Sequence, residues 1–226
     1  MLSTKYSAPE GLIRLRSTAR VASHALLLLA FAVIVACLFP PPMHAQGSLS
    51  LGTIAVSNVA WSCDPTGGWY YYRNSNGNTY MTCQNAVINC PNTQNISLSF
   101  GVIDPTAVGL VSKTLGTVVI LGGDGGVAPG NFGFADSFFR AGYEIVEMTW
   151  AADWEQTYMP FTQGETASIQ NAACRPATFL NFAYTTLFPS VQSANSRAGF
   201  CAHGASAGSA EIAYSLAYYG AGSWLD

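Results

Sequence analysis

The pattern of hydrophobic and polar positions changes near residue 116. Before it, over residues 49–103, short stretches of alternating apolar and polar positions are separated by turn residues at 64–68 and 74–78. Alternation with a period of two is typical of strands that have one buried face. We therefore expect short antiparallel strands in this part of the chain. Its aromatic stretch, residues 69–72, favours a packed sheet face over a surface that binds a sugar or a polymer.

After residue 116 the pattern predicts alternating strands and helices. The continuous apolar run 117–121 is typical of a buried parallel strand, and five loop residues that are glycine except for Asp124 follow it. Further strands are expected over 143–150 and 197–201, and helices over 132–141, 165–187 and 207–219. The last helix is expected to bury a stripe of Ala210, Ala213, Leu216 and Ala217. This order predicts an α/β protein with a parallel sheet.

The first 45 residues match a secretory signal peptide. Basic residues precede the uncharged apolar run 25–38, and three prolines follow it at 40–42. A membrane-spanning helix needs about 20 apolar residues, so a spanning helix is disfavoured. The predicted cleavage follows Ala45, and the protein is expected to be exported. The alternatives are a lipid anchor at Cys37 or an uncleaved membrane anchor, and membrane contact is expected only through this segment.

Composition narrows the class of protein. The chain has 226 residues, of which 50% are hydrophobic and 9% are charged. Disordered chains are polar and highly charged, so disorder is excluded. Lysine and arginine total 9 against 12 acidic residues, so nucleic-acid binding is not expected. We assign residues 46–226 to one domain, with a leading strand region at 46–110 and a core at 111–226.

Five of the six cysteines lie after the leader, and export makes disulfides plausible. Two of Cys63, Cys83 and Cys90 are expected to pair, and Cys174 with Cys201 forms a second expected pair. An odd number leaves one cysteine without a partner in this chain. No histidine lies at a metal-ligand spacing from these cysteines, so no metal site is expected.

The main candidate for chemistry is the segment 204–208, a G-x-S-x-G motif between a predicted strand and a predicted helix. A tight strand-to-helix turn would hold the Ser206 hydroxyl exposed on a strained backbone. Gly204 and Gly208 remove side chains that would clash, and the Ala207 amide is a candidate oxyanion donor. The alternative is a small-residue turn in which Ser206 only caps the helix.

With this motif in place, residues 117–219 resemble the core of a secreted α/β-hydrolase of the esterase or lipase type. The resemblance implies a mostly parallel sheet with leading antiparallel strands. It also implies that the loop after the third strand donates a second oxyanion amide, here Gly123 or Asp124. The implied reaction is attack of Ser206 on a small or polymeric ester through an acyl-enzyme, without a cofactor.

The partners that this resemblance requires are missing from the sequence. In the family the acid and then the histidine follow the serine, whereas the three histidines here all precede Ser206. His203 is too close to Ser206 in the chain to serve as its base and is expected to line a pocket or to be structural. Asp226 comes too early to be the acid. The chain is therefore interpreted as the front of a longer hydrolase, inactive alone, whose C-terminal strands are missing.

Two alternatives remain. Residues 123–128 also fit the dinucleotide fingerprint G-x-G-x-x-A, with Glu147 near the end of the next strand as the ribose ligand. The other alternative is a non-catalytic secreted binding protein on a hydrolase scaffold.

Overall fold

The computed structural model describes residues 49–63, 67–74, 76–128, 132–155 and 168–226. The chain divides into two compact units, residues 1–44 and 45–226, and the described residues all belong to the second. The predicted leader, with Cys37 and the cleavage site after Ala45, lies outside the described residues. Within the part that is described, no helix is both long enough and apolar enough to cross a bilayer.

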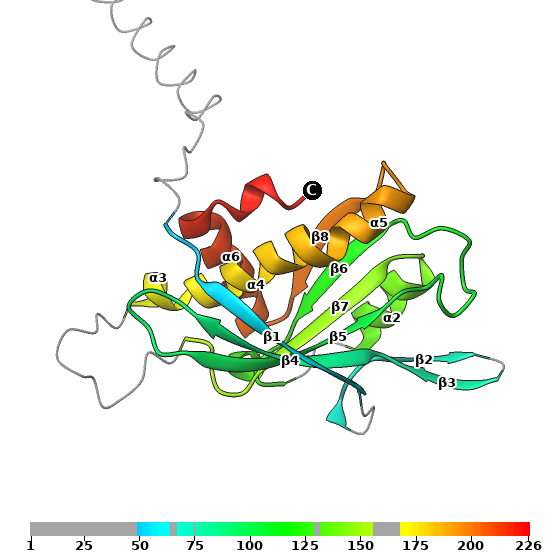
Figure 1. The fold of residues 1–226 in the computed structure, drawn as a ribbon, viewed down its shortest axis with the longest axis horizontal. Coiled ribbons are helices and arrows are strands. Elements are labelled where there is room, and N and C mark those ends of the chain that lie inside the picture. Colours follow the sequence, from blue (N-terminus) through cyan, green and yellow to red (C-terminus); the bar gives the residue numbers. More distant parts are fainter. Residues whose placement is uncertain (1–48, 64–66, 75, 129–131, 156–167) are drawn as a thin grey trace, which may run out of the picture. The chain divides into compact units, whose positions relative to one another are not determined.

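The strands form one six-stranded sheet and one two-stranded hairpin. They are β1 (Thr53–Ser62), β2 (Tyr71–Asn74), β3 (Gly77–Tyr80), β4 (Thr82–Asn89), β5 (Ile96–Ile103), β6 (Gly116–Leu121), β7 (Glu144–Trp150) and β8 (Gly199–Gly204). The sheet order is β1-β4-β5-β7-β6-β8, and the β2–β3 hairpin extends beyond one end of the sheet (Figure 1). The strands predicted after residue 116 are therefore confirmed, with bounds that differ by a few residues.

The sheet is mixed, which corrects the expectation of a mostly parallel sheet. In the described residues β6 pairs in parallel with β7 and β8, whereas β1–β4, β4–β5 and β5–β7 are antiparallel pairs. β4 and β5 follow one another directly through a short turn, whereas the β2–β3 hairpin lies between β1 and β4, and β6 and α2 lie between β5 and β7. The α/β class predicted from the sequence is confirmed.

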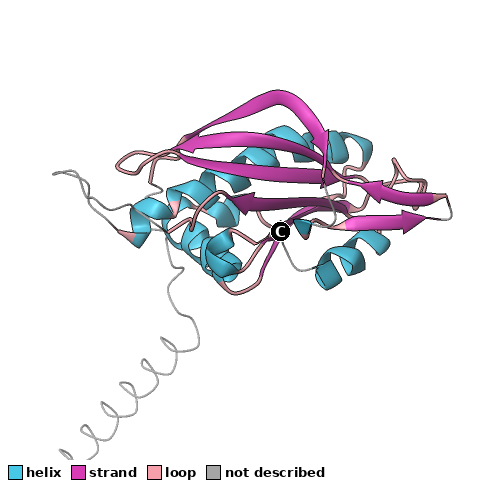
Figure 2. Cartoon of the chain, turned by 90° about the horizontal axis from the view of Figure 1, so that it is seen from below, coloured by secondary structure: helices cyan, strands magenta, loops and turns pink. Residues whose placement is uncertain are grey.

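Helices cover both faces of the sheet (Figures 1 and 2). They are α2 (Phe132–Arg140), α3 (Ile169–Ala172), α4 (Cys174–Phe182), α5 (Phe188–Ala194) and α6 (Ala207–Tyr219), with a π-helical turn at Ala183–Leu187 and a 3₁₀ turn at Asp124–Gly126. α2 packs in one apolar cluster and α4, α5 and α6 in the other. The predicted helix 165–187 is thus divided between α3, α4 and the π turn.

The apolar run in β6 connects the two clusters. All its residues are buried. Val118 and Ile120 point into the cluster beneath α2, whereas Val119 and Leu121 point into the cluster beneath α4, α5 and α6. Because both faces of this central strand are covered, it needs no polar positions, as the sequence predicted.

The buried face of α6 differs from the predicted stripe. The buried residues are Gly208, Glu211, Ser215 and Tyr219, and Leu216 is exposed. Small and polar side chains line this face because α6 lies close to the backbone of β6 and of the loop that follows it. Apolar periodicity therefore indicated the helix correctly but its buried side wrongly.

Each face of the sheet carries one disulfide. Cys63 pairs with Cys83, which confirms that two of the first three cysteines pair. Cys90 pairs with Cys174, whose Cα atoms lie 6.0 Å apart, and Cys201 is free. The predicted Cys174–Cys201 bond was wrong because Cys174 packs in the cluster of α4 whereas Cys201 packs on the α2 side, with the sheet between them.

The aromatic stretch before and within β2 packs against α2. Trp69 and Tyr70 are buried, and the Tyr70 and Tyr72 rings lie 5.6 and 5.1 Å from the Phe139 ring. The Tyr70 hydroxyl also donates to Asp136 of α2. The packed-face interpretation of these residues is therefore confirmed.

Candidate functional site

The site lies where the carboxyl ends of β6 and β8 meet. The chain leaves β6, crosses through α2 to β7 on one side, and later reaches β8 on the other side. Leu121, the last residue of β6, is paired with Gly204, the last residue of β8. In open α/β sheets ligands bind outside the carboxyl ends of the strands, at the point where successive connections run in opposite directions. The glycine loop and Ser206 both follow directly from these two strand ends.

Ser206 has the backbone conformation of a strained turn. Its φ is 53° and its ψ is −116°, outside the regions that non-glycine residues normally occupy, which costs about 1–3 kcal/mol. It directly precedes α6, but its side chain makes no hydrogen bond to the first turn of that helix. The alternative in which Ser206 only caps the helix is therefore wrong. The residue is exposed, so its hydroxyl is accessible.

The two glycines of the motif are required by space. A Cβ atom on Gly204 would overlap the Gly208 carbonyl, and one on Gly208 would overlap the Leu121 carbonyl. The Ala205 amide donates to the Leu121 carbonyl at 3.3 Å, which fastens the turn to β6. The local sequence thus forms this turn because small residues let strand β8, helix α6 and strand β6 approach to backbone contact.

The glycine loop lies against the serine. A Cβ atom on Gly123 would lie 3.5 Å from the Ser206 Cβ. Asp124, Gly125 and Gly126 follow with φ values of 53°, 65° and 79°, a run of left-handed residues. The Gly126 amide donates to the Gly123 carbonyl at 2.9 Å and closes the turn. The loop therefore brings Gly123 beside Ser206, while the choice between the Gly123 and Asp124 amides as oxyanion donor stays open.

Residues at the end of β7 and just after it support the glycine loop, and Arg175 of α4 supports them in turn. The Trp154 amide donates to the Gly125 carbonyl at 3.0 Å, and the Thr149 hydroxyl donates to the Val127 carbonyl at 2.6 Å. Arg175 of α4 is buried and donates through Nη1 to the Trp154 carbonyl at 2.6 Å. Burial lowers the pKa of this arginine. Sequence reasoning missed Arg175, because its backbone partners lie far away in the chain.

His203 and Asp226 do not serve Ser206 in this structure. The His203 ring packs 4.4 Å from the Phe134 ring, and its buried Nε2 has no hydrogen-bond partner among the described residues. This matches the packing role expected from the sequence. Asp226 accepts from the Phe200 amide at 2.8 Å and is thus held beside the first half of β8, away from its carboxyl end.

Glu147 is not placed to bind a ribose. It lies in the middle of β7, is fully buried and accepts a hydrogen bond from the Tyr70 amide at 2.8 Å. A ribose ligand must be exposed at a strand end. The glycine loop also forms a 3₁₀ turn before α2 rather than leading straight into a long helix. Both observations weigh against the dinucleotide interpretation.

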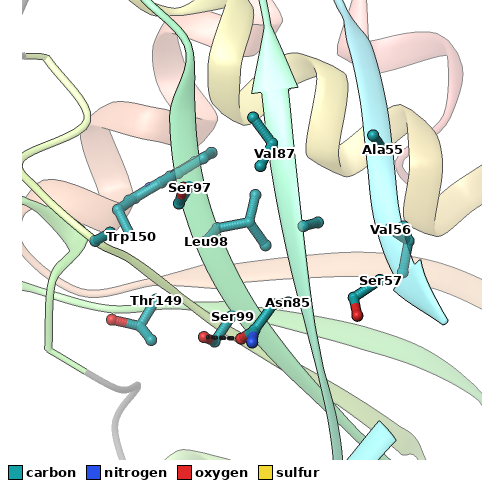
Figure 3. Close-up of a pocket in the computed structure, with 12 residues that line it drawn as sticks. Ala55, Val56, Ser57, Asn85, Val87, Ser97, Leu98, Ser99, Thr149 and Trp150 are labelled. Atoms are coloured by element: carbon teal, nitrogen blue, oxygen red, sulfur yellow. Dashed lines mark hydrogen bonds between the residues drawn. The ribbon is translucent and has the colours of Figure 1, made fainter. Parts of the chain in front are cut away.

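A hollow of about 500 Å³ lies on the sheet near the end of β7 (Figure 3). β1 shifts its register against β4 between Val56 and Ala60, next to Val56 and Ser57 of the lining. Serine, threonine and asparagine side chains share the lining with apolar ones, and no lining residue is charged; the polar members are Ser57, Asn85, Ser97, Ser99 and Thr149. The hollow is linked to the glycine loop through Thr149, which lines it and binds the Val127 carbonyl. Sequence patterning did not predict it, because its lining comes from four segments that lie apart in the chain.

Neither a metal-binding group nor a similarity to known proteins gives further information about the site. In the described ranges, no group of three or more His, Cys, Asp or Glu side chains is arranged to hold a metal ion. No protein-family model, curated protein or solved structure matches this chain. The functional interpretation therefore rests on the geometry around Ser206.

Proposed function

We propose that the protein is an exported serine hydrolase that cleaves carboxylic esters through an acyl-enzyme on Ser206. The observation that carries the proposal is the strained Ser206 backbone between a parallel strand and a helix, with its side chain released from capping. A merely structural serine gains nothing from such a conformation, whereas a nucleophile must be exposed at the strand end. The two disulfides support export.

The geometry supports stabilisation of an oxyanion beside Ser206. When the serine oxygen attacks an ester carbonyl, negative charge develops on the carbonyl oxygen. The Ala207 amide opens α6, and the N-terminus of this 13-residue helix favours negative charge. The adjacent glycine loop supplies the second amide, from Gly123 or Asp124. Two backbone donors of this kind are the usual arrangement for acyl transfer.

The proton acceptor must come from outside the described residues. A serine hydroxyl is a weak nucleophile until a base removes its proton. His203 is packed against α2 and Asp226 is bonded to Phe200. The proposal therefore requires an imidazole and a carboxylate that the described residues do not bring to Ser206. The proposed substrate is a carboxylic ester, small or polymeric.

Ester hydrolysis by the complete gene product tests the proposal. We expect turnover of 4-nitrophenyl butyrate that is lost in Ser206→Ala and retained in Ser193→Ala, a matched change of an exposed serine on α5. Turnover that survives Ser206→Ala would contradict the proposal. A folded wild-type protein without any turnover would favour the second candidate, a non-catalytic binding protein on this scaffold. The packed position of His203, away from Ser206, supports that candidate.

A further inference from the structure

Glu211 is a buried acid that the proposed chemistry does not use. It lies in the second turn of α6 and is fully buried. Its Oε2 accepts a hydrogen bond from the Trp150 Nε1 at 3.1 Å. Its Oε1 is also buried and has no hydrogen-bond partner within the described part of the chain. An isolated buried carboxylate is costly, so its retention in this helix calls for a role.

The unpartnered oxygen of Glu211 lies against the glycine loop. A Cβ atom on Gly126 would come within 2.6 Å of Glu211 Oε1 and would overlap the Trp150 ring. The Gly126 backbone thus rests directly on both side chains. Gly126 closes the turn by donating to Gly123, and Gly123 is the residue beside Ser206. Glu211 is therefore connected to the neighbourhood of Ser206 through Gly126 and Gly123.

We infer that Glu211 is a positioning residue, which together with Trp150 forms the floor that holds the Gly123–Gly126 loop beside Ser206. This role rests on the proposed function, since the loop matters to chemistry only if its amides stabilise an oxyanion. Glu211 itself touches neither substrate nor the reacting atoms. It acts by fixing the position of the loop relative to α6. This position matters because a misplaced amide donor weakens an oxyanion hole.

The carboxyl performs this role in its neutral form. Burial, reinforced by the charge of Glu155, raises the pKa of Glu211 to about 8, although the Trp150 hydrogen bond opposes the rise. The charged groups on the surrounding elements are Glu155 and Asp153 after β7, Asp124 in the loop, and Arg175 in α4. Ionisation above pH 8 would place a negative charge directly beneath the loop that must stabilise an oxyanion. Turnover should therefore fall on the alkaline side.

Four variants of the complete gene product test the role by turnover of 4-nitrophenyl butyrate between pH 6 and pH 9.5. Glu211→Gln keeps the neutral shape, so we expect kcat/KM at pH 7 within about threefold of wild type and no alkaline decline. Glu211→Ala should lower kcat/KM about tenfold to a hundredfold. Trp150→Phe should fall between these two. Glu144→Gln, a matched change of a buried acid at the other end of β7, should keep the wild-type pH profile.

Amide hydrogen exchange of residues 122–128 provides a readout that does not need activity. We expect faster exchange of this loop in Glu211→Ala and wild-type exchange in Glu211→Gln and Glu144→Gln. Unchanged exchange and unchanged kcat/KM in a folded Glu211→Ala protein would overturn the inference, as would an alkaline decline that persists in Glu211→Gln. Faster exchange in Glu211→Ala with no turnover in wild type would instead refute the proposed function.

Discussion

The two ends of the parallel strands contain similar residues in very different states. At the amino end, Glu144 of β7 is buried and accepts a hydrogen bond from the Thr117 hydroxyl at 2.9 Å. At the carboxyl end, Glu211 packs under the glycine loop with one oxygen unpartnered among the described residues. Burial raises the pKa of both acids, to about 7 and about 8. One end satisfies its buried acid, and the other leaves it partly unsatisfied beside a strained serine.

Backbone strain follows the same division. Of the described residues, the non-glycine ones with positive φ are Asn92, Asp124 and Ser206. Asn92 lies in the turn between β4 and β5, and asparagine tolerates this conformation well. The other two lie together at the carboxyl ends of β6 and β8. Natural proteins break local rules mainly at functional sites, so this concentration supports the proposal that the site lies at the carboxyl end.

Filling the space at the turn of the G-x-S-x-G motif should have the largest effect on stability. Gly208→Ala places a Cβ atom into the Leu121 carbonyl, a backbone atom that cannot move aside. We expect a loss of about 5 kcal/mol in the free energy of unfolding, enough to leave much of the protein unfolded. Urea denaturation measures the loss. In Gly222→Ala the added Cβ meets only the Leu216 side chain at 3.6 Å, so this control should stay within about 1 kcal/mol of wild type. Equal stability of the two variants would refute the steric account of the motif.

Two of the buried acids, Glu144 and Glu211, should make stability depend on pH. Both carboxyls have an ordinary pKa of 4.5, so as the pH rises from about 4.5 the unfolded chain releases their protons while the folded chain retains them. Stability should therefore fall toward pH 7 for Glu144 and toward pH 8 for Glu211, by roughly 1 kcal/mol per pH unit for each acid, and level off above.

Urea denaturation across this pH range checks the assignment. Glu144→Gln should remove the part of the slope that ends near pH 7, and Glu211→Gln the part that continues toward pH 8. The double variant should lose the part of the slope that these two acids cause between pH 4.5 and pH 8. A double variant with the wild-type slope would show that other groups cause the dependence.

Two threonine variants, with the smallest expected effects, compare the amino and carboxyl ends of the parallel strands. Thr117→Val removes the donor to Glu144, and Thr149→Val removes the donor to the Val127 carbonyl of the glycine loop. Each should cost about 1 kcal/mol of stability. Only Thr149→Val should lower kcat/KM for 4-nitrophenyl butyrate, by at least about threefold. An equal loss of activity in both variants would mean that the two ends do not differ in function.

The sequence predicted the order of elements well where the signal is local. The apolar run of β6, the glycine loop and the G-x-S-x-G turn depend on neighbouring residues, and the structure places them as expected. The Cys90–Cys174 pair has a sequence separation of 84, so cysteine spacing could not reveal it. Long-range pairing of this kind depends on which face of the sheet each cysteine occupies.

The supports of the site were not predictable from the sequence. Nothing in the sequence pattern singles out Glu211, because burial against a glycine backbone leaves no apolar signature. Arg175 binds two backbone carbonyls that lie far from it in the chain, those of Trp154 and Gln94. Such contacts depend on tertiary packing rather than on residue pattern, so the sequence predicted the tight turn at Ser206 but not the residues that support it.

Covalent labelling with a fluorophosphonate probe tests the central claim most directly. The probe phosphonylates only a serine that its surroundings have made nucleophilic, and peptide mapping identifies the residue. We predict that the complete gene product is labelled at Ser206 and that Ser206→Ala abolishes the labelling, whereas Ser193→Ala leaves it unchanged. Labelling that survives Ser206→Ala, or a folded wild-type protein that is not labelled at all, would contradict the assignment of Ser206 as the nucleophile.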